Sequence, residues 1–312
     1  GVVQSSSLGR LFDAASWLLT GITPTFEAHA AMHLEYVANR VDHARGTTNA
    51  ATSFPDLFME LLSPGDISER ALRFHHGVAR LLAAQLRAAA EAAGVELARI
   101  HLAGAPAFGS PPLGWPGPNF IGTQIQACEP DPDWARFYTT QRVLPFYRKA
   151  MDAGNIHDPE RTVERACELI AAATWESAHV APGVAGRIHG DLWSGNLLYG
   201  RPVSKNVLTE TALDDASTDN GGDDGGVEPF FIDPAAHGGH PETDLAMLAL
   251  FGTPFIEDVF EGYQSVRPLA DDWQDFIPVH QLHPLAVHAF THGPSYGHEL
   301  LRCATDVVRL LG

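Results

Sequence analysis

The sequence is poor in basic residues, and above all in lysine. Only two lysines occur, Lys149 and Lys205, and 20 Lys and Arg residues stand against 38 Asp and Glu residues, so the formal net charge is -18. A surface of this sign repels phosphate backbones and anionic lipid headgroups. The composition therefore argues against nucleic acid as a partner and against electrostatic attachment to a membrane.

Cysteine and long apolar runs are also scarce. The three cysteines, Cys128, Cys167 and Cys303, are odd in number and far apart, which argues against a disulfide framework and fits a reducing compartment. No apolar run approaches the roughly 20 residues that span a bilayer, and the first residues lack the basic and then apolar layout of a signal peptide. We expect a cytoplasmic protein without a membrane segment.

Motifs of several common enzymes and metal sites are missing. The sequence contains no G-x-x-x-x-G-K-[ST] phosphate loop and no G-x-S-x-G nucleophile elbow, which argues against P-loop nucleotide hydrolases and serine hydrolases. Histidine pairs occur at His237 with His240 and at His280 with His283, but no cysteine or carboxylate cluster near them in sequence completes a tetrahedral set. We expect structural histidines there rather than zinc ligands.

What is present is a globular chain with an uneven organisation. Its 312 residues are 45% hydrophobic and include six Trp, enough for one large or two modest domains. Short apolar bursts beside one helical pattern predict a small α+β unit over residues 1–62. A break at "SPGD" follows, and Asp66 with Glu69 forms a capping box that begins a long helix ending near Gly94. Residues 63–312 form the second, larger part.

The larger part is mainly helical, with one polar interruption. Apolar residues recur at helical spacing over 133–153, over 159–179 and in the tail. Residues 204–229 are rich in Asp, Gly, Ser and Thr and cannot offset their own ordering entropy by burial, so we expect a flexible acidic insertion. A short buried strand ending in Asp233 and a helix with an acidic first turn, "PETDLAMLALFG", follow it.

The stretch "RIHGDLWSGNLLYG", residues 187–200, places a His, an Asp and an Asn in one short loop. Asp191 and Asn196 stand across a turn and can face one cavity, and Asp233 at a strand end can supply another oxygen. Three oxygen-bearing side chains around one point suit phosphoryl transfer, in which catalysis consists mostly of positioning and of neutralising charge. Each of them taken singly can also be a turn residue, but their order and spacing favour the chemical interpretation.

Two neighbours in this loop have structural alternatives of their own. We interpret His189 as a residue that packs behind the loop and fixes its backbone. Trp193 lies beside Asp191 in sequence and can stack on a substrate, although a Trp is more often part of a core.

Four segments carry a family resemblance. "HGDLWSGN" followed by "FFIDPAAHGGHPETDLAMLALFG", with "NFIG" and "DWARFYTTQRVLPF" upstream, resembles the fructosamine kinase (ketosamine-3-kinase) family, a branch of the aminoglycoside phosphotransferase and protein-kinase-like fold. The resemblance covers about residues 100–312. It implies a two-lobe, protein-kinase-like α+β fold. Residues 1–62 would form a reduced or degenerate N-terminal lobe, and residues 63–312 a mainly helical C-terminal lobe with the catalytic loop 187–200.

The resemblance also implies roles for individual residues. Asp191 is the expected catalytic base, and Asn196 and Asp233 are expected to hold Mg²⁺ on ATP. The helix "PETDLAMLALFG" is expected to buttress the loop. Members of the family use ATP to phosphorylate ketoamines, which are sugar-derived adducts on protein amines or small molecules, so the expected partner is a ketoamine.

The N-terminal part departs from the family pattern. "LFMELL" resembles the strand and hinge that cradle adenine, which implies an adenine-binding role for Glu60, Leu61 and Leu62. In "FEAHAAMHL", His29 stands where the family has a Glu that pairs with a phosphate-binding lysine, and no lysine precedes Lys149. A guanidinium is not equivalent to an ammonium at such a position. The arginines available as substitutes are Arg10, Arg40 and Arg45.

Three interpretations of function stay open. The chain is a working ketoamine kinase with an altered or truncated small lobe, a pseudokinase-like binder of a nucleotide or partner, or a kinase for another acceptor such as choline or an aminoglycoside. The set Asp191, Asn196 and Asp233 favours the first, and the missing lysine and glutamate favour the second. An acidic cleft suits any cationic acceptor, so charge does not distinguish a ketoamine kinase from a choline or aminoglycoside kinase.

Overall fold

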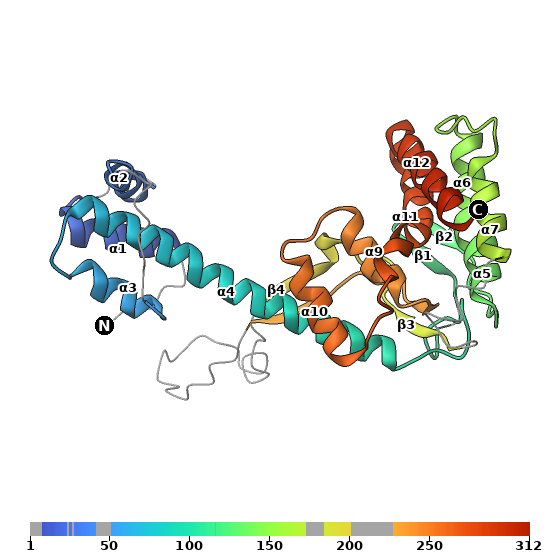
Figure 1. Cartoon of the computed structure of the whole chain (residues 1–312), viewed down its shortest axis with the longest axis horizontal. Helices are drawn as coiled ribbons and strands as arrows, with labels where there is room; N and C mark the ends of the chain where they lie inside the picture. Colours follow the sequence, from blue (N-terminus) through green and yellow to red (C-terminus); the bar gives the residue numbers. More distant parts are fainter. Residues whose placement is uncertain are drawn as a thin grey trace, which may run out of the picture. The chain divides into compact units, whose positions relative to one another are not determined.

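The structure, a computed structural model, divides the chain into two compact units, residues 1–87 and 88–312 (Figure 1). The division falls inside one long helix, between Arg87 and Ala88, and each unit buries apolar clusters of its own. Among the described residues, no helix is both long enough and apolar enough to cross a bilayer. The structure describes residues 8–23, 25–26, 28–41, 51–115, 117–172, 184–200 and 227–312.

The first unit is helical wherever it is described. Its amphipathic segments each bury one face in a shared apolar cluster that includes Leu34 and Phe74. Asp66 caps the long helix as expected, because its carboxylate accepts hydrogen bonds from the backbone N–H groups of Ser68 at 2.8 Å and Glu69 at 3.2 Å. The small α+β unit expected here is therefore all-helical over its described residues. The helices are α1 (Leu8–Thr20), α2 (His29–Ala38), α3 (Phe54–Leu61) and α4 (Ile67–Leu102), which continues into the second unit.

The segment "LFMELL" lies in helix α3 and its C-cap, so the strand and hinge expected at Glu60, Leu61 and Leu62 are wrong. Ser53 caps the helix by accepting a backbone hydrogen bond, and Leu57 and Leu61 fill its buried face. At the end of the helix, the Leu62 N–H donates to the Met59 carbonyl, and the Glu60 carbonyl accepts from the Ser63 hydroxyl. A short apolar run is ambiguous between strand and helix, and here the cap and the buried face decide for helix.

In the second unit, the remainder of α4 packs closely against α10 (Ile256–Val266). A Cβ on Gly94 would lie 1.9 Å from the carbonyl oxygen of Val259, and a Cβ on Gly262 would lie 2.0 Å from that of Glu91. Only glycine lets two backbones approach this closely. The helix expected to end near Gly94 therefore continues to Leu102, because this glycine serves helix packing rather than termination.

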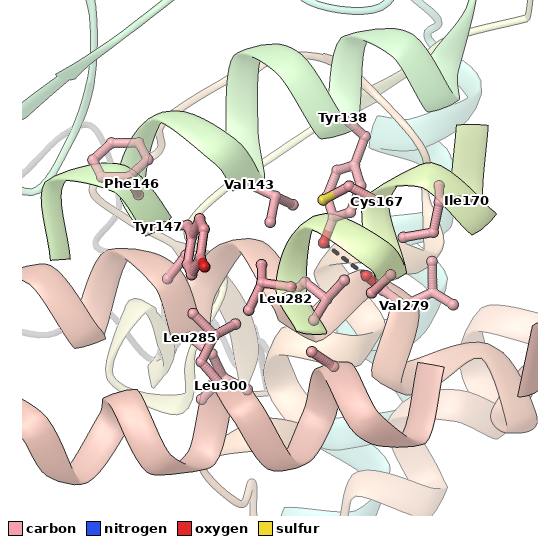
Figure 2. Packing of buried hydrophobic residues seen from close by; sticks show 14 of the residues in the cluster. Tyr138, Val143, Phe146, Tyr147, Cys167, Ile170, Val279, Leu282, Leu285 and Leu300 are labelled. Carbon is pink, nitrogen blue, oxygen red and sulfur yellow. Dashed lines mark hydrogen bonds between the residues drawn. The ribbon is translucent and has the colours of Figure 1, made fainter. Parts of the chain in front are cut away.

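Helices α6, α7, α11 and α12 enclose the main apolar cluster of the second unit (Figure 2). Tyr147, Leu282 and Leu300 are almost fully buried in it. The helices predicted over 133–153 and in the tail are confirmed, and the one predicted over 159–179 is described up to Ala172. The elements are α5 (Trp134–Phe137), a π-helical turn (Tyr138–Val143), α6 (Leu144–Asp152), α7 (Thr162–Ala172), α9 (Glu242–Leu250), α11 (Ile277–His292) and α12 (Pro294–Leu311), with 3-10 turns at Ser194–Asn196 and Trp273–Phe276.

Helix α11 contains Pro284, which removes one helical N–H donor. The buried hydroxyl of Tyr138 compensates for this loss, because it lies 2.8 Å from the Val279 carbonyl (Figure 2) and 2.9 Å from the His280 carbonyl. The same hydroxyl accepts a hydrogen bond from the His283 N–H at 3.1 Å. Tyr138 thereby supplies hydrogen bonds to backbone groups of α11 in the turn before Pro284.

Short antiparallel strand pairs complete the described part of the second unit. The register pairs Arg187 with Gly238 and Leu198 with Phe230. A flexible insertion is expected over 204–229, but residues 228 and 229 belong to a strand, and its residues up to 226 lie outside the described ones. The pairs are β1 (Asn119–Ile121) with β2 (Gln124–Gln126), β3 (Gly186–Ile188) with β6 (His237–Gly239), and β4 (Leu197–Gly200) with β5 (Glu228–Phe231).

Candidate active site

Two of the strand pairs bring two loops together. The loop from His189 to Asn196 joins β3 to β4, and residues 232–236 join β5 to β6, while β3 pairs with β6 and β4 with β5. The Ile232 N–H donates to the Asn196 carbonyl at 3.0 Å, and His189 Nε2 donates to the Ile232 carbonyl at 2.9 Å. His189 thus fixes the loop backbone, as the sequence predicts.

Asn196 shapes the bend that carries Asp191. Its side chain is buried, and its amide nitrogen donates to the Asp191 carbonyl at 2.8 Å. The same carbonyl accepts from the Trp193 N–H at 3.2 Å. Because the amide nitrogen is used inside the loop, the amide oxygen is the atom that Asn196 can offer to a cation.

Asp233 follows Ile232 directly and is exposed, with its backbone in the left-handed region at a φ of 52°. This conformation is uncommon outside glycine and concentrates at functional sites. Burial raises the pKa of Asp191 above its usual value, and the charges of Asp244 and Asp233 raise it further, while His189 lowers it. The structure therefore places Asp233 within electrostatic reach of Asp191.

Helix α9 anchors the loop of residues 189–196 through Asp244, whose side chain is buried. The carboxylate accepts hydrogen bonds from the N–H groups of His189 at 2.7 Å and Gly190 at 2.9 Å, and it lies 3.0 Å from His101 Nε2 on α4. His101 Nδ1 in turn lies 2.8 Å from the Tyr263 hydroxyl on α10. Burial acts to raise the pKa of Asp244, but the hydrogen bond and charge of His101, with His189 and the Gly190 N–H, hold it below its usual value.

Asp191 lines a cleft of about 540 Å³ within the second unit. The Trp193 ring lies over Gly195, where a Cβ would stand 2.2 Å from the indole. Glycine at this position therefore lets the indole lie against the loop backbone and border the cleft. The other lining residues are Ser194 of the same loop, Ile121, Gly122 and Thr123 around the β1–β2 turn, Phe251, Val287, His288, Thr291 and His292 of α11, and Tyr296 of α12.

The sequence singles out only part of this lining. His288, His292 and Tyr296 recur every four residues, which is the one signal that could have found them, and ordinary buried helix faces show the same spacing. Trp193 borders the cleft, and its contact with a substrate stays a prediction. The predicted adenine-binding residues 60–62 lie in the first unit and do not line this cleft.

A buried cluster in the second unit brings together His240, Glu242 and His280, whose potential ligand atoms lie within 4.8 Å of one another. The Glu242 N–H donates to His240 Nδ1 at 3.3 Å, so the proton of the neutral His240 ring sits on Nε2. His280 Nε2 lies 3.6 Å from the Glu242 carboxylate. A cation on His240 Nε2 would require the ring to lose that proton. The geometry therefore favours a buried polar contact between the Glu242 carboxylate of α9 and the His280 ring of α11 over a zinc site.

Comparison with known families separates the two ends of the chain. The family model of fructosamine kinase matches residues 78–309, which contain every residue of the cleft. A second model, described as the second subdomain of a carbamoyltransferase Kae1-like domain, matches residues 1–105. The part expected to form a small kinase lobe, residues 1–62, thus lies ahead of the fructosamine kinase match and is similar to a different family.

Named relatives match the same region. A protein of Enterococcus faecium named "Probable ketoamine kinase" is 29% identical over 184 residues, which are 58% of this chain and 56% of the relative. A protein of Lactiplantibacillus plantarum with the same name is 32% identical over 165 residues, 53% of this chain and 49% of the relative. The chain spans about half the length of the curated relatives it matches.

Solved structures share the fold of this chain. A crystal structure assigned as a fructosamine-3-kinase from Thermobifida fusca has a TM-score of 0.55 and 38% identity, and the match covers 71% of this chain and 65% of that one. A structure from Haemophilus somnus, at a TM-score of 0.52 and 17% identity over 71% and 63% of the two chains, shows the fold alone. The fold is kinase-like, mostly helical with few strands. Because the family model covers residues 78–309, the chain belongs to the fructosamine kinase family.

Proposed function

We propose that the second unit carries the acceptor half of an ATP-dependent ketoamine kinase. A sugar hydroxyl of the ketoamine enters the cleft, and Asp191 orients it and takes its proton as the γ-phosphoryl group is transferred. Family membership and the names of the relatives support this substrate class. The observation that carries the proposal is the position of Asp191, on a bend anchored by Asp244 and at the edge of an aromatic cleft.

The electrostatics of Asp191 suit a general base. Burial and the nearby carboxylates raise the pKa of this group, and His189 limits the rise. A base accepts a proton more readily as its pKa approaches the working pH. The same desolvation that destabilises the charge therefore increases the driving force for proton transfer from a hydroxyl.

Asn196 and Asp233 fit the magnesium ion of Mg-ATP. One offers an amide oxygen and the other an exposed carboxylate, and hard oxygen donors are the ligands that Mg²⁺ prefers. When bound, the ion would neutralise charge on the ATP phosphates. Because Asn196 and Asp233 belong to the same pair of loops as Asp191, the proposal places the γ-phosphoryl group next to the acceptor cleft.

A second function, a nucleotide or partner binder with impaired transfer, has an observation of its own. No lysine precedes Lys149. His29, which the sequence resemblance compares with the family's glutamate but which lies ahead of the matched residues 78–309, stacks on Phe26 at 4.5 Å and accepts a hydrogen bond from the Thr25 N–H. The described residues of the first unit contain no strand. Within these 312 residues, such features favour binding without the lysine that holds the ATP phosphates in the family.

Binding and transfer separate the two functions experimentally. Thermal shift with Mg-ATP measures nucleotide binding, and ADP release with a fructosylated amine, choline and an aminoglycoside measures transfer. A ketoamine kinase releases ADP with the fructosylated amine, and Asp191→Asn reduces this rate by about 10²- to 10⁴-fold. Asp152→Asn, at an exposed position of α6, is the matched control and retains the rate.

Each outcome assigns the chain to one class. Release that survives in Asp191→Asn contradicts the role of that residue as base. A thermal shift without release for any acceptor supports the impaired binder. Release with choline or an aminoglycoside alone moves the chain to another acceptor class.

A further inference from the structure

The cleft that holds Asp191 is lined by neither lysine nor arginine among the described residues. The whole chain carries a net charge of -18. An acceptor with a phosphate or a carboxylate inside the cleft would find no strong cation to pair with, and Asp191 would repel it. The electrostatics therefore favour an acceptor that carries a positive charge.

Aromatic rings supply much of the cleft wall. The ring centroids of His288 and His292 lie 4.9 Å apart at an interplanar angle of 20°, and the His288 ring lies 5.0 Å from Tyr296 and 4.8 Å from Phe251. Trp193 borders the same cleft from the catalytic loop. Faces of aromatic rings attract an amine cation that has left water. The wall thus has the composition of an ammonium site.

Hydrogen bonds decide which nitrogen of each imidazole carries the proton. His288 Nδ1 lies 2.8 Å from the Pro284 carbonyl, which only accepts, so Nδ1 is the donor. The Thr291 hydroxyl donates its single proton to the Val287 carbonyl at 2.8 Å. It therefore accepts from His292 Nδ1, which lies 2.8 Å away. Both neutral rings keep their lone pair on Nε2, where it can accept from an N–H donor.

The His288 ring is held in its neutral form. Burial lowers the pKa of His288, and the neighbouring His292 lowers it further, while the hydrogen bond to Pro284 raises it. Two stacked imidazoles also disfavour a shared positive charge, because like charges repel. At neutral pH the His288 ring therefore presents a hydrogen-bond acceptor rather than a cation.

We propose that the wall of His288 and His292 makes the cleft selective for ketoamines whose protonated amine has no carboxylate beside it. The ammonium N–H groups donate to the Nε2 atoms, and the charge rests against the aromatic rings. Adducts of alkylamines and of lysine side chains meet this requirement. Adducts of α-amino acids, with a carboxylate one carbon from the nitrogen, do not. The inference rests on the proposed kinase function, in which Asp191 acts on the sugar of the ketoamine. It adds that His288 and His292 recognise the amine of the same molecule.

A matched pair of acceptors tests the selectivity. Fructosylated propylamine and fructosylated glycine have nearly the same shape and differ in the carboxylate. We expect the full chain to bind the propylamine adduct at least about tenfold more tightly by calorimetry, with kcat/KM showing the same preference. His292→Lys, at the exposed end of α11, places an ammonium in the wall and should reduce or reverse the ratio. His298→Lys, at an exposed position of α12 outside the cleft lining, should leave it unchanged.

The results distinguish this inference from the kinase proposal. Equal affinity for the two adducts, binding of neither, or a ratio that His292→Lys leaves unchanged overturns the selectivity. Selective binding without any ADP release contradicts the kinase function and leaves the selectivity standing. ADP release at equal kcat/KM for both adducts contradicts the selectivity alone. Circular dichroism melts establish that each variant is folded, and the wild-type ratio tests the inference even if a variant is not.

Discussion

Asp191 sits in surroundings that disfavour its negative charge. Burial raises its pKa, the charges of Asp244 and Asp233 raise it further, and His189 lowers it. The folded chain therefore keeps this proton at pH values where the unfolded chain, with a pKa of about 3.9, has released it. The folded state loses stability as the pH rises from the unfolded pKa through the folded one, so at neutral pH this carboxylate destabilises the fold.

Asp191→Asn is consequently expected to stabilise the protein at pH 7, although the same change is expected to slow the proposed transfer. Asn has a similar size and no charge, so it removes the unfavourable term. Urea unfolding should give a higher free energy of unfolding for the variant at pH 7, and the difference should shrink toward zero near pH 3. Asp152→Asn should show no such difference. A variant that is less stable than wild type at pH 7 would mean that the carboxylate makes net stabilising contacts.

Gly195 is expected to act through Trp193. Its missing Cβ makes room for the indole, which would otherwise stand 2.2 Å from it. Gly195→Ala should displace the ring and raise the acceptor KM by about tenfold, with a smaller change in kcat, because a lost apolar contact is worth roughly 1–3 kcal/mol. In a Trp193→Ala background, the same change should add little. Additive effects in this double-mutant cycle would show that alanine at 195 acts elsewhere.

At the scale of elements, α9 anchors the loop of residues 189–196 through one buried carboxylate. The Asp244 side chain accepts from two successive loop N–H groups and meets His101 of α4, which continues to Tyr263 of α10. Helices α4 and α10 approach closely at Gly94. The loop is thus connected to a rigid helix pair, which explains how a short polar bend keeps a fixed position.

Asp244→Ala should lower the free energy of unfolding by about 3–5 kcal/mol, because the loop N–H groups and His101 lose their buried acceptor. The pKa of Asp244 lies below its usual value, so its contribution is present above the unfolded pKa and is lost as the pH falls through the folded one. Denaturant unfolding should therefore show a gap between wild type and variant that narrows from pH 5 toward pH 2. A gap below about 1 kcal/mol at pH 7 would contradict the anchoring role.

At the scale of the whole molecule, the described residues form two units with separate cores. Leu34, Leu57 and Phe74 belong to the core of the first unit, whereas Leu282 and Leu300 belong to that of the second. The two ends of the chain also match different family models. Separate cores predict that a cavity in one unit affects that unit first.

Leu57→Ala should destabilise the first unit by about 2–5 kcal/mol, since its side chain is fully buried. Hydrogen exchange followed by mass spectrometry should become faster in α1, α2 and α3 and stay unchanged in α11. Leu282→Ala is the reciprocal variant and should give the opposite pattern. Equal acceleration in both units for either variant would show that they unfold together.

Local patterns in the sequence determined the bend of residues 189–196 and most of the described helices. His189, Asp191 and Asn196 lie within eight consecutive positions, so their spacing alone predicts that they share one bend. The Asp66 cap and the periodicity of the tail helices likewise involve residues within one or two turns. Such features are readable because their interactions form between neighbours in the chain.

The tertiary structure alone decided the rest. "LFMELL" is compatible with strand or helix, and burial of its apolar face in the core of the first unit decides for helix. Gly94 resembles a helix stop in the sequence, but it lies where α10 packs against α4. His288 and His292 acquire a candidate role only because α11 lines the same cleft as Asp191. These outcomes depend on burial and close packing between segments far apart in sequence, and no local pattern encodes the partner.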